Sequence, residues 1–379
     1  MDTIVHMDLD TFFVEAERLR DSQLIGKPVL VGGLSARAVV ASCSREARRF
    51  GVRSGMSTKE ALRLCPEAVV RRGDMDYYSG LSRTVTEIIA GSAPLFEKAS
   101  IDEHYLDLTG MEKHFGAFKW AHELRGSITK NTGLPISFGL SANKTVSKIA
   151  TTMAKLATGE LSVDQGREKP FLAPLSVGRI PGVGKQLQLD LAYKGVSKIS
   201  VLQQLPVELM EMAHGKIGTQ VWRKGQGIDP SPVTPYTEQK SMSRERTFMV
   251  DTTSQAMLKK KLMEMVSDLG YELRAAGKMT GCITIKIRYS NFDTHTKQSV
   301  IPYCSLDDAL ITKALSLFEK TYSRRLLVRL LGVKFSNLVA GSYQIDLFND
   351  SQEAVSLYQS LDGIRSRFGY KAILRAAIL

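Results

Sequence analysis

Two adjacent acids inside an apolar stretch constrain this chain more than any other feature. Residues 100–110 read SIDEHYLDLTG, so Asp102 and Glu103 stand among aliphatic and aromatic residues typical of a strand or of the turn before one. Burying unpaired carboxylates is costly, and acids near a core usually bind a cation, for which hard oxygen ligands favour Mg²⁺. Because neighbouring side chains of a regular strand point to opposite faces, the chain must turn or bulge if both acids serve one site.

A second acidic segment lies at residues 4–10, IVHMDLD, an apolar strand that ends in Asp8 and Asp10. A helical pattern follows at once, so Asp10 is expected to be its N-cap. Asp8 together with Asp102 and Glu103 would form the ligand set for two Mg²⁺ ions about 3.5–4 Å apart, an arrangement used for in-line displacement at phosphorus. Spacing alone leaves open that these acids are solvated or merely cap helices.

Composition limits the class of protein. A chain of 379 residues exceeds one ordinary core, so several domains are expected. The net charge of +12 suggests a polyanionic partner, although a basic protein kept soluble by its charge is the alternative. The four cysteines lack metal-ligand spacing and are expected to be free thiols. No signal peptide and no membrane-spanning apolar run is recognisable, which predicts a cytoplasmic protein without membrane contact.

The two acidic segments, VHMDLDTFF from position 5 and SIDEHYLDL from position 100, resemble the two catalytic motifs of Y-family DNA polymerases, most closely the DinB or DNA polymerase IV branch. The resemblance covers roughly the first 340 residues. It implies an α+β fold of right-hand polymerase architecture. The expected parts are a palm of antiparallel sheet plus helices (1–10 and 74–165), small fingers (11–73), a helix-hairpin-helix thumb (166–229), a linker (230–240), a little finger (241–340) and a C-terminal tail (341–379).

The resemblance also assigns roles at the site. Asp8, Asp102, Glu103 and the backbone carbonyl of Leu9 would bind two Mg²⁺ ions. The nucleotide-binding residues would be Phe12, Phe13, Ser42, Arg45, Arg48 and Lys155, with Phe13 as the steric gate that excludes a ribose 2′-hydroxyl. Arg45 departs from the tyrosine usual in the family, although its forked donors could still hold a phosphate. His104 departs as well, since alanine or glycine is often found beside the acids.

Two later regions are expected to grip DNA. Pro181, Gly182, Gly184 and Lys185 form a helix-hairpin-helix signature, whose glycines let backbone amides cradle a phosphate, although any tight turn could produce the pattern. Three prolines between 229 and 235 then predict an extended linker. Beyond it the strand and helix patterns follow the order β-α-β-β-α-β. Arg244, Arg246, Lys286 and Arg288 are expected on one open sheet face that tracks phosphates, with salt-sensitive binding.

The segment from Gln344 to Phe348, QIDLF, resembles the pentapeptide by which bacterial polymerases dock on the β sliding clamp. Gln344, Leu347 and Phe348 would then fill an apolar groove of the clamp. The alternative is a strand that continues from the preceding apolar residues. The helical pattern after this segment carries no assigned role.

The sequence therefore predicts a low-fidelity, template-directed DNA polymerase that bypasses damaged bases, takes dNTPs and primer-template DNA, has no proofreading segment and works as a monomer. A catalytically inactive DNA-binding accessory protein of the same family is the main alternative, and the presence of all three acids argues against it. A nucleotidyl cyclase would also place paired acids on a sheet. The hairpin signature and the basic final domain have no use in a cyclase.

Overall fold

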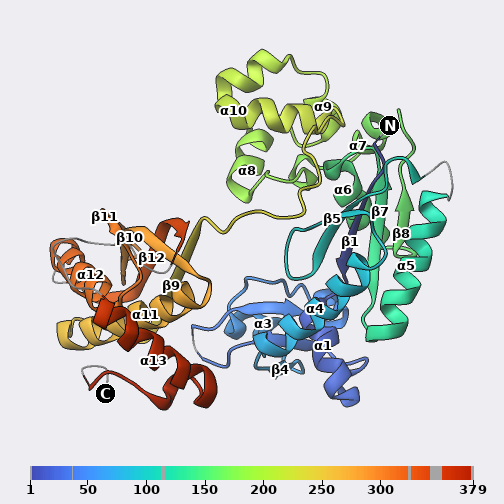
Figure 1. Cartoon of the computed structure of the whole chain (residues 1–379). Helices are drawn as coiled ribbons and strands as arrows, with labels where there is room; N and C mark the ends of the chain where they lie inside the picture. Colours follow the sequence, from blue (N-terminus) through green and yellow to red (C-terminus); the bar gives the residue numbers. More distant parts are fainter. Residues whose placement is uncertain (1, 36, 112–115, 323–325, 342–351, 377–379) are drawn as a thin grey trace. The chain divides into compact units, whose positions relative to one another are not determined.

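The computed structural model describes residues 2–35, 37–111, 116–322, 326–341 and 352–376. These residues form two compact units, Met1–Thr237 and Glu238–Leu379 (Figure 1). The boundary falls within the proline-rich stretch 230–240 that the sequence predicts to be a linker. The division of the first unit into palm, fingers and thumb stays a prediction. Among the described helices, none is long and apolar enough to cross a membrane.

A five-stranded sheet is the centre of the first unit, with the order β5-β6-β1-β7-β8. Its strands are β1 (Ile4–Leu9), β5 (Leu95–Lys98), β6 (Glu103–Asp107), β7 (Ile136–Ser141) and β8 (Glu160–Ser162). All neighbours pair antiparallel except β7 and β8, which are parallel. The predicted antiparallel sheet is therefore confirmed, with one parallel pair at this edge. Helix α6 (Lys144–Ala154) joins β7 to β8, and a helical crossover is the connection that parallel strands need.

Helices cover both faces of this sheet (Figure 1). On one face Val5, Met7 and Leu9 of β1 belong to a buried core shared with α4 (Met75–Ala90) and α5 (Ala117–Thr132). The alternation of a strand sends His6 and Asp8 to the other face, where the imidazole of His6 contacts α6. The acids of the site thus lie between the sheet and a single helix.

Gly139 of β7 determines how closely α6 approaches the sheet. It is the register partner of His6. A Cβ atom at this position would stand 2.3 Å from the carbonyl oxygen of Ser147 and 2.4 Å from the amide nitrogen of Thr151, both in α6. Glycine inside a strand often marks such a close backbone approach. Here it lets the side chains of α6 reach the acids.

Replacing Gly139 by alanine is expected to push α6 outward and to lower the free energy of unfolding by about 1–3 kcal/mol, the usual cost of overpacking. Gly126→Ala is the matched control, because Gly126 lies on the exposed side of α5 with nothing within 4 Å of an added Cβ. That change should stabilise the helix by about 0.5–1 kcal/mol. Urea unfolding of both variants measures the difference. Equal stability of the two would contradict the close-approach role.

Two smaller parts complete the first unit. A three-stranded sheet, order β3-β2-β4, has its own small core. Its elements are α1 (Phe12–Arg20), η1 (Ser22–Leu24), β2 (Val29–Gly32), β3 (Val40–Cys43), α2 (Arg45–Arg49), α3 (Thr58–Leu64) and β4 (Val69–Arg71). A helical part follows with α7 (Glu168–Leu172), η3 (Val177–Arg179), α8 (Lys185–Tyr193), α9 (Ile199–Leu202) and α10 (Val207–Gly225). Glycines make its turns, since Gly182 has a φ of 100° before α8 and Gly215, with a φ of 60°, breaks α10.

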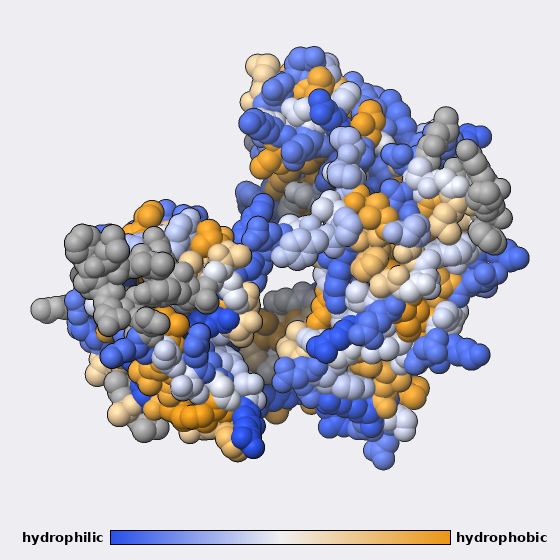
Figure 2. Space-filling view, in the orientation of Figure 1, coloured by the Kyte–Doolittle hydropathy of each residue, from blue (hydrophilic) through white to orange (hydrophobic). Residues whose placement is uncertain are grey.

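The second unit confirms the β-α-β-β-α-β order. Its elements are β9 (Ser241–Thr252), α11 (Gln255–Ala275), β10 (Lys278–Tyr289), β11 (Thr294–Cys304), α12 (Asp307–Thr321) and β12 (Val328–Ala340). The sheet is antiparallel with the order β11-β10-β12-β9, and α11 and α12 pack on one face around a second large core. In the view of Figure 2 most of the surface is hydrophilic, with smaller apolar areas on both units.

The C-terminal segment continues with α13 (Gln352–Phe368) and η4 (Tyr370–Ala372). Helix α13 packs against other elements of the second unit. The guanidinium of Arg274 in α11 binds the carboxylate of Asp362 in α13 at 2.6 Å. The hydroxyl of Tyr358 donates to the Asp308 carboxylate at 2.8 Å. The predicted clamp-binding residues Gln344, Leu347 and Phe348 lie outside the described residues.

Candidate active site

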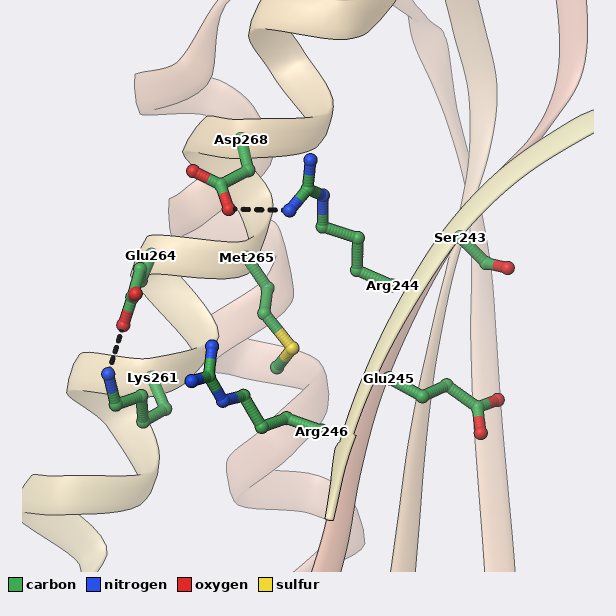
Figure 3. Close-up of a pocket in the computed structure, with 8 residues that line it drawn as sticks. All are labelled: Ser243, Arg244, Glu245, Arg246, Lys261, Glu264, Met265 and Asp268. Atoms are coloured by element: carbon green, nitrogen blue, oxygen red, sulfur yellow. Dashed lines mark hydrogen bonds and ion pairs between the residues drawn. The ribbon is translucent and has the colours of Figure 1, made fainter. Parts of the chain in front are cut away.

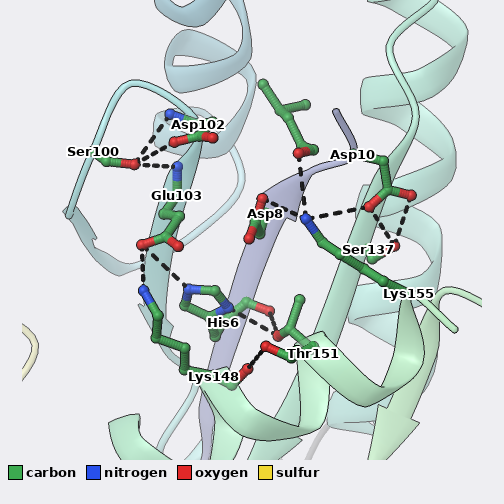
Figure 4. Close-up of polar contacts among 12 residues, drawn as sticks. His6, Asp8, Asp10, Ser100, Asp102, Glu103, Ser137, Lys148, Thr151 and Lys155 are labelled. Atoms are coloured by element: carbon green, nitrogen blue, oxygen red, sulfur yellow. Dashed lines mark hydrogen bonds and ion pairs between the residues drawn. The ribbon is translucent and has the colours of Figure 1, made fainter. Parts of the chain in front are cut away.

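The three predicted acids meet at adjoining strand ends (Figure 4). Strands β1 and β6 pair antiparallel with Asp8 opposite Glu103. Asp102 lies in the bend before β6, and its carbonyl accepts a hydrogen bond from the amide of Leu9 at 3.0 Å. Ser100 shapes this bend, since its hydroxyl donates to the Asp102 carboxylate at 2.5 Å and accepts from the amide of Glu103 at 3.1 Å. The turn expected between the two adjacent acids is therefore present.

A pocket of about 240 Å³ opens beside these strand ends. Eight of the ten residues predicted for metal or nucleotide binding line it: Asp8, Leu9, Phe12, Phe13, Ser42, Arg48, Asp102 and Lys155. Thr11, Ala41 and Ser54 complete the lining. The two predicted residues that do not line it are Glu103 and Arg45. The pocket thus joins two acids, two cations and an aromatic wall from the sheet, α1, the small sheet and the end of α6.

Asp8 carries the strongest sign of a functional carboxylate. Burial raises its pKa to about 6, against the opposing effect of the Lys155 ammonium, whose Nζ is 2.6 Å from Asp8 Oδ1. A carboxylate in this setting is held ionised at neutral pH by a neighbouring cation. The site is therefore built to keep a positive charge beside Asp8.

The carboxylate of Glu103 is turned away from the pocket toward α6. Its Oε2 lies 2.6 Å from Lys148 Nζ and 3.9 Å from His6 Nε2. The neighbouring imidazole and the Lys148 ammonium lower the pKa of Glu103 to about 2, although burial works in the other direction. His6 is buried as a core residue would be, and its Nδ1 shares a hydrogen bond of 2.9 Å with Thr151 Oγ1.

Asp10 does not cap α1, contrary to the expectation. Thr11 is the N-cap, with a φ of 43°. The buried Asp10 carboxylate instead accepts from the Ser137 hydroxyl at 3.0 Å and from the Arg45 guanidinium at 3.0 Å, and it lies 3.3 Å from Lys155 Nζ. The Asp10 carboxylate is thus bound by donors outside α1 and does not accept from the amides of its first turn. For the same reason Arg45 is directed to Asp10 and not into the pocket.

The aromatic wall of the pocket is rigidly supported. The ring of Phe13 stacks on Tyr78 of α4, with centroids 4.6 Å apart and planes at 16°. The Tyr78 hydroxyl donates to Glu17 Oε1 at 2.6 Å, and both groups are buried. Phe12 packs into the core beneath the ring, 3% exposed. The position of Phe13 is therefore set by side chains from two helices.

A row of polar side chains lies along one face of α6 opposite acids of the sheet, and its last member, Lys155, is the only one predicted as part of the site. Lys144, Lys148, Thr151 and Lys155 follow one another at intervals of four, three and four residues, which places them on one helical face. Lys144 binds Glu97 at 2.6 Å, and the next two lysines of the row bind Glu103 and Asp8. The helical spacing of these lysines indicates that they share one face of α6. It predicts their ion pairs only if acids are known to lie on the facing strands.

The fit of a metal ion depends on oxygen atoms at the end of β1. Among the described residues, no group of three His, Cys, Asp or Glu side chains could hold a metal ion as they stand. The Lys155 ammonium, however, already lies among the Asp8 carboxylate, the Leu9 carbonyl at 3.4 Å and the Asp10 carboxylate. Oxygen donors that hold one cation suit a divalent cation as well. The residues present therefore fit a metal that displaces this lysine.

The four basic residues expected on one face of the second unit lie on two faces. In β9, Arg244 points to α11 and binds Asp268 at 2.9 Å (Figure 3). Arg244 and Arg246 both line a second pocket, between β9 and α11, that is separate from the one beside Asp8. Their register partners in β12 are Val333 and Leu331, which belong to the core. The alternation of β10 puts Lys286 and Arg288 on the opposite, open face. The expectation of a single basic face is therefore wrong.

Comparison with known proteins identifies the family. Models of the impB/mucB/samB family and of its C-terminal domain match residues 7–152 and 239–347. A DNA polymerase IV from Dehalococcoides mccartyi is 36% identical over 98% of this chain and 96% of the relative. One from Methanoculleus marisnigri is 36% identical over 89% and 95%, and one from Xanthomonas axonopodis pv. citri is 35% identical over 92% and 98%.

A solved structure supports the same conclusion for the fold. A Y-family DNA polymerase chimera matches with a TM-score of 0.79 and 23% sequence identity, covering 89% of this chain and 100% of that chain. The predicted resemblance and the predicted α+β polymerase architecture are thereby confirmed. This chain therefore belongs to the impB/mucB/samB family of Y-family DNA polymerases.

Proposed function

We propose that the chain is a template-directed DNA polymerase of the translesion type, which adds dNTPs to a primer 3′ end with low fidelity. The observation that carries the proposal is that Asp8, Asp102, Phe13, Arg48 and Lys155 line the same pocket. Relatives named DNA polymerase IV, similar over nearly the whole chain, support it. An inactive accessory protein would have no need of acids gathered beside a pocket that cations and an aromatic ring also line.

Divalent metal ions are the expected cofactors of such a polymerase. Asp8, Asp102, Glu103 and the backbone carbonyl of Leu9 would hold two Mg²⁺ ions, and Glu103 would have to turn away from Lys148 to take part. When bound, the ions would favour the primer 3′-oxyanion and neutralise charge on the triphosphate. The protein's own contribution is to keep these oxygens at the ends of two rigid neighbouring strands.

The remaining pocket residues would hold the incoming nucleotide. Ser42 of β3 and Arg48 of α2 would contact the triphosphate from one side, and Lys155 at the end of α6 would contact it from the other. Among the described residues the Arg48 side chain has no ion-pair or hydrogen-bond partner, so its charge is free for a ligand. Phe13 would close the space beside the sugar. Arg45 would act through Asp10, and not on the phosphates directly.

Primer-template DNA would be gripped outside the pocket. The turn of Pro181, Gly182, Gly184 and Lys185 would cradle a backbone phosphate, and Lys286 and Arg288 would face DNA from the open side of β10. Of these two, Lys286 also binds Glu245 across Gly332 of β12, so its charge is partly neutralised. Gln344, Leu347 and Phe348 would bind a β sliding clamp. The protein would act as a monomer in the cytoplasm.

Primer extension by the purified protein tests the proposal. With Mg²⁺, a primed template and single dNTPs, we expect incorporation directed by the template base, incomplete discrimination against wrong dNTPs, and no removal of a mismatched primer end. If the protein binds primed DNA but extends it with none of the four dNTPs, the accessory function holds instead.

A further inference from the structure

The ammonium of Lys155 contacts oxygen atoms of three consecutive residues. Its Nζ is 2.6 Å from Asp8 Oδ1, 3.4 Å from the carbonyl oxygen of Leu9 and 3.3 Å from Asp10 Oδ1 (Figure 4). Two of these groups, the Asp8 carboxylate and the Leu9 carbonyl, are the proposed metal ligands on β1. A protein cation therefore stands where a metal ion would bind.

The packing of α6 holds Lys155 in this position. Lys155 is the C-cap of α6, and the helix lies at backbone contact with β7 because of Gly139. The lysine side chain is only 25% exposed, so the ion pair is partly shielded from water. Charges this close in a partly buried site interact far more strongly than surface charges do. A divalent cation cannot share the Asp8 oxygens with the ammonium without strong repulsion.

We propose that Lys155 is a resident counter-ion, which occupies the metal-binding oxygens of β1 in the nucleotide-free enzyme and moves to the triphosphate when nucleotide and metal arrive together. The inference rests on the proposed function, in which Asp8 binds metal and Lys155 contacts phosphate. Metal alone must displace Lys155 without a new partner for the ammonium. Metal that arrives with a nucleotide brings that partner, so each ligand strengthens the binding of the other.

Arg45 explains how Lys155 can leave without exposing a bare buried charge. Asp10 is only 7% exposed, and an unpaired carboxylate there would be costly. After the departure of Lys155, the Asp10 carboxylate keeps the Arg45 guanidinium at 3.0 Å and the Ser137 hydroxyl at 3.0 Å. Because Arg45 continues to neutralise Asp10, Lys155 can move away without leaving this buried carboxylate unpaired. Lysine suits such movement because its compact charge sits on a flexible stem.

The test is a titration of the full chain with Mn²⁺, without DNA or nucleotide. Electron paramagnetic resonance measures the concentration of free Mn²⁺ and so gives the affinity. We expect Lys155→Met to bind Mn²⁺ about fivefold more tightly than wild type, since a nearby positive charge has been removed. Lys144→Met is the matched control, because Lys144 lies on the same helix and binds an acid of the same sheet, Glu97. Its Mn²⁺ affinity should equal that of wild type. Lys155→Arg keeps the charge and should restore weak binding.

The result that would overturn the inference is wild-type Mn²⁺ affinity in a Lys155→Met variant whose thermal unfolding is normal. Asp8→Asn separates this failure from a failure of the proposed function. If Asp8→Asn loses Mn²⁺ binding while Lys155→Met gains none, the metal site stands and the counter-ion role falls. If Asp8→Asn binds Mn²⁺ as wild type does, Asp8 is not a metal ligand and both proposals fall.

Discussion

Asp102→Ala is expected to lower the rate of nucleotide incorporation by about a thousandfold or more. Loss of one of the carboxylates that would hold the metal ions removes several kcal/mol of transition-state stabilisation, and each 1.36 kcal/mol is tenfold. Asp102 lies in the bend before β6 and faces the pocket beside Asp8. Its own carbonyl holds the amide of Leu9, and this backbone contact survives the substitution. The fold should therefore persist while the chemistry is lost.

The measurement is single-turnover incorporation of the correct dNTP, together with DNA affinity by fluorescence anisotropy. Asp107→Ala is the matched control, because Asp107 is an acid at the other end of β6. Within the described part of the chain, its carboxylate accepts only from the amide of Thr109, at 2.9 Å. It should keep most of the activity. Wild-type rates in Asp102→Ala would remove Asp102 from the metal site. Unchanged DNA affinity alongside the loss of rate would assign the effect to chemistry.

The acids of the site were predictable because strand ends are local features of the sequence. Apolar residues followed by Asp8, and an apolar stretch after Asp102, mark the ends of two strands without any tertiary information. That β1 and β6 are neighbours is not a local property. The joint ligand set was one hypothesis among others until the resemblance to known polymerases supported it. The orientation of Glu103 could not be predicted, since it depends on Lys148, which α6 brings from another part of the chain.

The fold of the second unit shows the same limit. Alternation in β10 predicted correctly that Ile283, Ile285 and Ile287 are buried. Strand β9 carries charged residues on both sides, so periodicity could not decide which side faces α11. The register of β9 with β12 sets this orientation, because Arg244 lies opposite the core residue Val333. Its guanidinium therefore binds Asp268 and Glu272 of α11. The ion pair of Glu245 and Lys286 also lacks a local signal, because it needs Gly332 between them.

Phe13→Ala is expected to raise the incorporation of NTPs relative to dNTPs by about a hundredfold, because forcing a hydroxyl into occupied space costs about 1–3 kcal/mol and this penalty would disappear. The ring can act as a barrier only if it cannot move aside. Its stacking on Tyr78, and the bond from Tyr78 to Glu17, supply that rigidity. Removing the ring leaves these supports in place and opens the pocket wall.

The decisive quantity is the ratio of the two incorporation efficiencies measured with one enzyme preparation, since loss of folded protein lowers both equally. Phe50→Ala is the control, because Phe50 is a partly exposed phenylalanine at the end of α2 that does not line the pocket. It should leave the ratio unchanged. A wild-type ratio in Phe13→Ala would mean that another group excludes the 2′-hydroxyl. Because Phe13 and Asp8 line one pocket, a raised ratio would also show that the nucleotide binds with its sugar beside the proposed metal site.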